Sequence, residues 1–198
     1  MGRHFSMIRD FHLADAFTLG NGACGTAALF FAMDHVRERS VGKVYAAGAF
    51  IVLALIFDVL DGRIARWRHS ASPLGRELDS LADVISFGVA PAGLAFSLGL
   101  TGLWDALVLL YFVCCGISRL ARYNVTAADL SRETGKVRYF EGTPIPTSVV
   151  PLGLLMLAFH YRELYPVRVL GLSFHLVTLL FLLSGSLMIS KTLRIPKP

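Results

Sequence analysis

Four aspartates at regular spacing are the residues of this sequence most suited to chemistry: Asp58 and Asp61, followed by Asp79 and Asp83. In a helix the first pair are i, i+3 neighbours and the second pair are i, i+4 neighbours, so each pair shares one helix face. Both pairs lie at the edge of long apolar runs, and an Asp at the middle of a membrane costs about 2.5–3.5 kcal/mol. Carboxylates gathered there need cations, and ligation by oxygen alone suits Mg2+, Mn2+ or Ca2+ rather than zinc. We therefore expect two helices to surround a metal site.

These aspartates belong to a longer pattern, D-x2-D-G-x2-A-R-x8-G-x3-D-x3-D, which starts at Asp58 and ends at Asp83. The pattern resembles the signature of the CDP-alcohol phosphotransferases, integral membrane enzymes of phospholipid synthesis. The resemblance implies that Asp58, Asp61 and Asp79 are metal ligands, and that Asp83 is a ligand that also accepts the proton of the alcohol. Two divalent cations about 3.5–4 Å apart would clamp a diphosphate and stabilise the leaving oxygen. The alternative for the same residues is a pair of buried Asp–Arg ion pairs between two membrane helices.

The same resemblance implies contacts to a CDP-linked lipid from Gly62, Arg66, Ser72 and Asn21. Gly62 carries no side chain, so a nucleotide can approach its helix backbone closely. Arg66 offers a bidentate fork to phosphate. Asn21 is a polar amide inside an apolar segment, and its alternatives are an interhelical hydrogen bond or a contact to a carboxylate or nucleotide.

The acceptor alcohol is suggested by the amino-acid sequence of three segments, 75–92, 119–124 and 142–146. These segments are similar to those of the phosphatidylserine synthase branch of the family. That similarity implies transfer of the phosphatidyl group from CDP-diacylglycerol to the hydroxyl of L-serine, with CMP released. L-Serine brings a carboxylate, which Arg119 or Arg122 could hold, and an ammonium group, which Glu141 could hold. The two arginines are i, i+3 neighbours and share one helix face.

Two other functions stay open from the residues alone. The acceptor could be glycerol 3-phosphate, inositol phosphate or choline, and a phosphorylated acceptor would use the basic charges of 119–138. A small cation transporter is the alternative from another class of protein. A transporter would favour acidic residues near the midplane of several spans, whereas here they gather at one membrane edge beside Gly62 and Arg66.

Composition indicates an all-α integral membrane protein formed by one domain, residues 1–198. More than half of the residues are hydrophobic and 17% are charged, unlike a soluble protein. The apolar runs predict a short interfacial helix within residues 1–14 and a kink in the third span at Pro91. Cys24, Cys114 and Cys115 lie in apolar runs without disulfide or metal spacing. The six predicted transmembrane helices cover about 14–33, 44–66, 75–98, 103–123, 146–161 and 166–189.

The distribution of positive charge predicts the orientation. Fourteen Lys and Arg residues lie in the N-terminus, 63–76, 119–138 and the tail, against five in the opposite loops. The positive-inside rule then places both termini and the aspartate motif on the cytoplasmic side. The net charge of +5 is accounted for by topology and contact with lipid headgroups rather than by nucleic acid. We expect a homodimer in the cytoplasmic membrane of a bacterium or archaeon, with CDP-diacylglycerol, L-serine and membrane lipids as partners.

Overall fold

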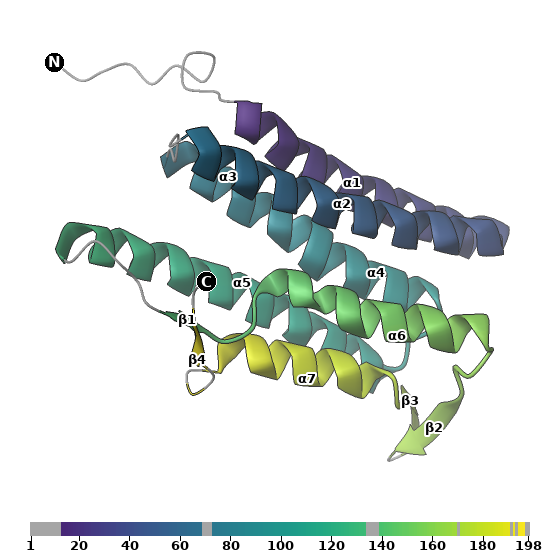
Figure 1. Ribbon diagram of the computed structural model, residues 1–198. Coiled ribbons are helices and arrows are strands. Elements are labelled where there is room, and N and C mark those ends of the chain that lie inside the picture. The colour runs from purple at the N-terminus through teal and green to yellow at the C-terminus, as the bar shows by residue number, and fades with distance from the viewer. Residues whose placement is uncertain are drawn as a thin grey trace, which may run out of the picture.

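Long helices lying side by side form most of this computed structural model (Figure 1). It describes residues 13–68, 73–133, 139–169, 171–190, 192 and 194–196. The helices in chain order are α1 (Leu13–Glu38), α2 (Val41–Arg68), α3 (Pro73–Asp83), the π-helix η1 (Val84–Val89), α4 (Ala90–Ser97), α5 (Leu103–Glu133), the 3-10 helix η2 (Ile145–Ser148), α6 (Val149–His160) and α7 (Thr178–Ile189). The strands are β1 (Tyr139–Glu141), β2 (Pro166–Val169), β3 (Leu172–His175) and β4 (Arg194–Pro196).

Four helical segments are long and apolar enough to cross a membrane: Asp15–Glu38, Val41–Ile64, Leu74–Ser97 and Leu103–Thr126. Each has 24 residues, which gives a length of about 36 Å, and a bilayer core is about 30 Å thick. Large apolar side chains on their outer faces are exposed, among them Phe30 at 63% and Leu110 at 63%. The prediction is therefore confirmed in its coarser form: the described part of the chain is mostly helical, and four of its helices could span a membrane. The apolar helices Ile145–His160 and Thr178–Ile189 are shorter.

Helices α1 and α2 pack against each other through small side chains. Ala28 and Ala32 of α1 are at most 2% exposed, and Ala47 and Ala54 of α2 are fully buried. Small side chains allow membrane helices to approach closely, where van der Waals contact replaces the hydrophobic effect as the attraction between them. The two helices meet through a short turn in which Arg39 has a positive φ of 54°. This close pair forms the support for the aspartates of α2.

The third span contains a π-helical stretch before its proline. The backbone N–H of Ala90 bonds to the carbonyl of Ile85, five residues earlier. Proline has no N–H, and its ring clashes with the carbonyl four residues before it. Wider π turns before Pro91 meet this constraint, and Pro91 itself lies at the start of α4. The irregularity therefore occupies Val84–Val89, directly after Asp83, instead of the position of the proline.

The prediction of a sixth membrane helix over about 166–189 is wrong for the first half of that range. Instead of a helix from residue 166, β2 and β3 form an antiparallel hairpin, and α7 begins at Thr178. The cause is Asp105 of α5, which is fully buried. It accepts hydrogen bonds from the backbone N–H of His175 at 2.9 Å, from Nδ1 of His175 at 2.8 Å and from Oγ1 of Thr178 at 2.7 Å. A buried carboxylate requires such donors, and they fix the chain before α7.

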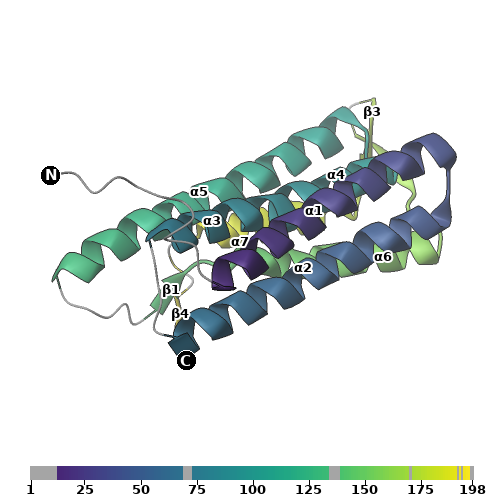
Figure 2. The same ribbon diagram turned by 90° about the horizontal axis from the view of Figure 1, so that it is seen from above.

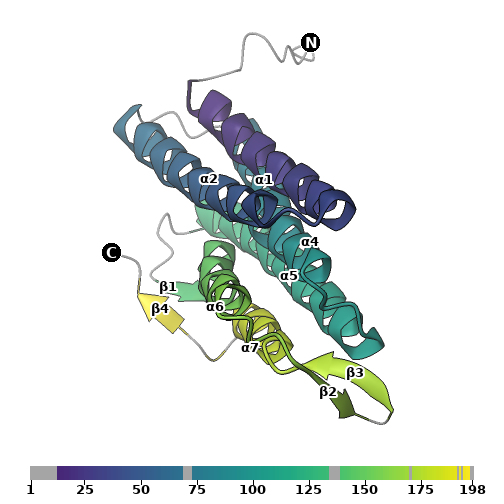
Figure 3. The same cartoon turned by 90° about the vertical axis from the view of Figure 1, so that its right-hand side faces the viewer.

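The two ends of the bundle carry different features (Figure 2). The C-terminal end of α2, the start of α3 and the C-terminal end of α5 lie at one end, together with the strands β1 and β4. The hairpin of β2 and β3 lies at the other. Strand β1 pairs antiparallel with β4, with Glu141 opposite Arg194, and the two strands lie side by side (Figure 3). Strand β4 thus returns to the end of the bundle that carries the aspartate motif. The interfacial helix predicted within residues 1–14 lies almost wholly outside the described residues, which begin at Leu13 with the first turn of α1.

We predict that Asp105 is required for stability. Asp105→Ala removes the acceptor of three buried hydrogen bonds and should lower the free energy of unfolding by about 3 kcal/mol. Asp34→Ala is the matched control, because Asp34 is 38% exposed in its ion pair with Lys43 and should cost less than about 1 kcal/mol. Thermal unfolding in detergent measures both. Equal melting temperatures for the two variants would contradict the role of Asp105.

Candidate functional site

The first carboxylate pair lies on α2, near its C-terminal end. Asp58 is half-buried and Asp61 is buried, and Gly62 follows on the same helix. The hydroxyl of Thr18 on α1 donates a hydrogen bond to Oδ2 of Asp61 at 2.8 Å, which orients that carboxylate. The sequence analysis missed Thr18. Its signal was a polar side chain one helical turn before Asn21 in an apolar span.

The second pair lies on α3, where Asp79 is half-buried and Asp83 is buried. The side chain of Asn124 near the end of the long α5 helix contacts the outer part of α3. Its Nδ2 donates to Oγ of Ser80 at 3.0 Å and to Oε2 of Glu77 at 3.3 Å. These bonds hold the helix that carries Asp79 against α5. The sequence analysis did not foresee this polar link.

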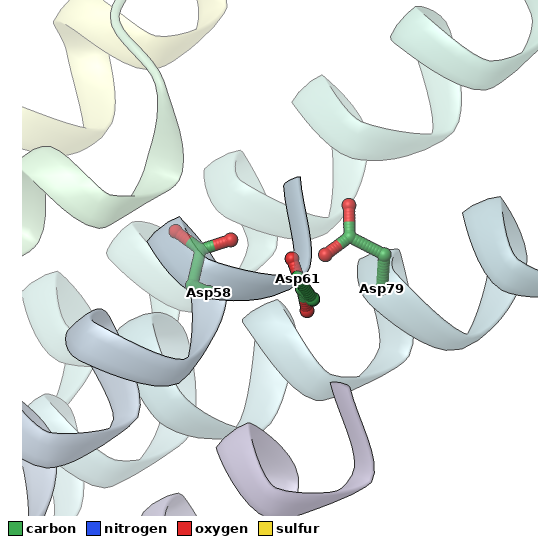
Figure 4. A group of neighbouring side chains, drawn as sticks. All are labelled: Asp58, Asp61 and Asp79. Carbon is green, nitrogen blue, oxygen red and sulfur yellow. The ribbon is translucent and has the colours of Figure 1, made fainter. Parts of the chain in front are cut away.

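Three of the four carboxylates converge. Asp58, Asp61 and Asp79 each offer an oxygen, and these oxygens lie within 4.8 Å of one another. Figure 4 shows the side chains of the two helices around one small space, with Asp79 directed toward Asp61. The predicted meeting of two helices is thus observed for these three residues. Asp83 stands outside this group, and its Oδ1 accepts a hydrogen bond from Nδ2 of Asn21 at 3.1 Å.

The arrangement fits a divalent cation. Among side chains that the structure describes, no lysine or arginine lies within ion-pair distance of the three clustered carboxylates. The Oδ1 atom of Asp79 is buried and has no hydrogen-bond partner in the described part of the chain. Uncompensated carboxylates at such short separation repel one another strongly in a poorly solvated site. Oxygen ligands are those that Mg2+, Mn2+ and Ca2+ prefer, so the donor set matches the expected cations.

The two arginines of α5 have different surroundings. Arg119 is 8% exposed, its charge interacts with that of Asp83, and its buried Nε has no hydrogen-bond partner among the described residues. Arg122 donates from Nη2 to the carbonyl of Ile189 at 3.2 Å. That carbonyl belongs to the last turn of α7, where a cation is favourable to the helix dipole. The guanidinium of Arg119 lies 6.0 Å from the ring centroid of Tyr123 and within the range at which its charge acts on Asp83, whereas Arg122 contacts the end of α7.

The residues predicted to contact the CDP-lipid are located less completely. Gly62 is half-buried on α2. Arg66 lies on the last turns of α2, with its side chain outside the described part, and Ser72 lies outside the described residues. Glu141 is placed by its backbone alone, in β1. The roles of these residues and of Asn21 toward substrate stay predictions.

Comparison with known proteins agrees with this site. Residues 11–185 match the family model CDP-alcohol phosphatidyltransferase. The chain is 43% identical to a protein of Saccharomyces cerevisiae named CDP-diacylglycerol–serine O-phosphatidyltransferase, over 98% of this chain and 74% of the relative. Proteins of the same name from Mycobacterium bovis and Bacillus subtilis are 38% and 35% identical. These alignments cover 87% and 81% of this chain, and 59% and 84% of the respective relatives.

The match includes the whole aspartate motif and each of the four long apolar helices. It confirms the resemblance drawn from the spacing of Asp58, Asp61, Asp79 and Asp83. The chain belongs to the CDP-alcohol phosphatidyltransferase family.

Proposed function

We propose that this protein transfers the phosphatidyl group of CDP-diacylglycerol to the hydroxyl of L-serine, giving phosphatidylserine and CMP. The observation that carries the proposal is the convergence of Asp58, Asp61 and Asp79 from two helices. Relatives that carry the name of this activity support the choice of substrates. In the reaction the serine oxygen forms a bond to the lipid-side phosphorus, and the bond from that phosphorus to the CMP oxygen breaks.

The donor side of the site holds the diphosphate. Two divalent cations, bound by Asp58, Asp61 and Asp79 with Asp83 as a further ligand, would supply positive charge to the diphosphate and the leaving oxygen. Gly62 leaves the α2 backbone open to the nucleotide. Arg66 and Ser72 are the further contacts to the CDP-lipid in this proposal. The chain thereby fixes the donor at the edge of the membrane.

The acceptor side is formed around Asp83. Asn21 engages Oδ1 of Asp83, and this leaves Oδ2 to accept the proton of the serine hydroxyl as the new bond forms. Arg119, buried and charged beside Asp83, holds the serine carboxylate with its guanidinium fork. We assign Arg122 a supporting role through α7. Glu141, which the sequence suggested as a contact of the ammonium group, is given no role in this proposal.

The finer topology belongs to this proposal as well. We infer one domain, residues 1–198, with six membrane crossings, and α6 and α7 as the last two. The motif end, where the chain is richest in Lys and Arg, faces the cytoplasm, and both chain termini lie there. We infer a homodimer in the cytoplasmic membrane of a bacterium or archaeon.

A panel of acceptors tests the function. Purified protein with CDP-diacylglycerol and Mg2+ or Mn2+ should release CMP on addition of L-serine. It should not do so with glycerol 3-phosphate, inositol phosphate or choline, because those acceptors lack the carboxylate that Arg119 would bind. EDTA, and Asp58→Asn, Asp61→Asn or Asp79→Asn, should lower the rate by more than about a hundredfold. Asp34→Asn, far from the site, is the control. A product lipid with another acceptor, or near-wild-type rates in two of the site variants, would overturn the proposal.

The arginines offer a sharper prediction. Arg119→Lys keeps the charge but loses the fork geometry, so it should raise the KM for serine about tenfold or more. The KM for CDP-diacylglycerol should change little. Arg122→Lys should lower the melting temperature and leave the ratio of the two KM values near that of the wild type. Steady-state kinetics with each substrate varied in turn, and unfolding in detergent, measure these effects. A reversal of the two phenotypes would assign acceptor binding to Arg122.

The mechanism predicts direct displacement without a phosphatidyl-enzyme. A carboxylate whose oxygens serve as ligands is a poor nucleophile, whereas a serine hydroxyl needs only a positioned base. We expect inversion at phosphorus with chirally labelled CDP-diacylglycerol. Retention, or exchange of labelled CMP into CDP-diacylglycerol without serine, would show a covalent intermediate on one of the aspartates.

A further inference from the structure

Asn21 has one half of its side-chain amide satisfied and the other half unsatisfied. The residue is fully buried in α1. Its Nδ2 donates to Oδ1 of Asp83 at 3.1 Å, while its Oδ1 is buried and has no hydrogen-bond partner among the described residues. A buried carbonyl oxygen without a donor costs about 1–3 kcal/mol. Such an atom beside the base of a reaction points to a ligand.

The orientation of this amide is fixed by chemistry. An ionised carboxylate only accepts hydrogen bonds, so the amide must present its NH2 group to Asp83. The carbonyl oxygen is then an acceptor about 2.2 Å from Nδ2. Any group that satisfies it has to be a donor.

Contacts from the π-helix hold Asn21 in place. Oγ of the fully buried Ser86 donates to the backbone carbonyl of Asn21 at 2.9 Å. Gly25 permits this approach, because a Cβ at that position would lie 2.4 Å from Oγ and 2.6 Å from Cα of Ser86. The segment after Asp83 thus packs directly on the turn of α1 that carries Asn21. This contact fixes the backbone from which the side chain of Asn21 reaches Asp83.

The free oxygen matches the ammonium group of an amino-alcohol acceptor. In serine the ammonium nitrogen and the hydroxyl oxygen are about 3 Å apart. Asn21 and its hydrogen-bonded partner Asp83 present two neighbouring acceptors, one for each group. Arg119 adds a cation near the same carboxylate. A carboxylate, an ammonium group and a hydroxyl on one small molecule would each find its complement here.

We propose that Oδ1 of Asn21 accepts a hydrogen bond from the ammonium group of the acceptor and is a specificity-determining residue. The inference rests on the proposed function, and it assigns to Asn21 the part first considered for Glu141. A contact of Asn21 with the acceptor and a contact of Asn21 with the CDP-lipid affect the kinetics of different substrates, so experiment can separate these two roles.

The test compares L-serine with 3-hydroxypropanoate, which has the carboxylate and hydroxyl but no ammonium group. The ratio of kcat/KM for the two acceptors is measured in the wild type, in Asn21→Ala and in the near-isosteric Asn21→Leu. Loss of the bond to Asp83 slows both acceptors and cancels in the ratio. We expect the preference for serine to fall about tenfold to a hundredfold in both variants. Thr26→Ala is the control, because its hydroxyl bonds to the carbonyl of Gly22 within α1, and it should keep the wild-type ratio.

Asn21→Asp keeps an acceptor oxygen, because the new carboxyl group shares a proton with Asp83 and leaves its second oxygen to the ammonium group. Its preference for serine should therefore match that of the wild type although its rates are lower. This variant decides the matter if the apolar ones do not fold, since a lower ratio would overturn the proposal. Binding of L-alanine and of propanoate, measured by the rise in the melting temperature of the protein, gives a readout without turnover. L-Alanine should stabilise the wild type more than propanoate does, and Asn21→Leu should lose the difference.

Three outcomes would overturn this inference without touching the proposed function. The first is an unchanged ratio of kcat/KM for the two acceptors in Asn21→Ala and Asn21→Leu, and the second is equal use of both acceptors by the wild type. The third is a rise in these variants of the KM for CDP-diacylglycerol alone, which would assign Asn21 to the nucleotide. A wild-type protein that makes no phosphatidylserine would instead overturn the proposed function itself.

Discussion

Repulsion among carboxylates that water solvates poorly is the constraint on which the site depends. Asp58, Asp61 and Asp79 approach within a few ångströms, although each would be more stable alone in water. The surrounding chain meets part of this cost with hydrogen bonds, such as the one from Thr18 to Asp61. A bound divalent cation would offset the remainder. The cluster is thus an arrangement of negative charge that could hold a metal ion.

Helix α1 has the central part in positioning these charges. From one side it reaches Asp61 through Thr18, and Asp83 through Asn21. The absence of a side chain at Gly25 lets the π-helix after Asp83 approach it closely. The clustered carboxylates thus occupy one end of the bundle. The bonds of Asp105 to the segment before α7 anchor the other end.

Local patterns in the sequence predicted much of this structure. Apolar runs located the four long helices, and the spacing of the aspartates predicted their convergence, because both depend on residues near one another in the chain. The hairpin before α7 could not be predicted in this way. Its conformation depends on Asp105, 70 residues from His175 in the sequence. The hydrogen bond of Arg122 to the carbonyl of Ile189 could not be predicted either, because the two residues are distant in sequence.

Whether the clustered carboxylates hold a cation can be measured by binding Mn2+ to the purified protein and recording its electron paramagnetic resonance. We expect saturable binding of two ions in the wild type. Asp61→Asn should weaken this binding by more than about tenfold, while Asp34→Asn, at the opposite end of the bundle, should leave it unchanged. Equal Mn2+ affinity in the wild type and Asp61→Asn would show that the clustered carboxylates have no part in holding a cation.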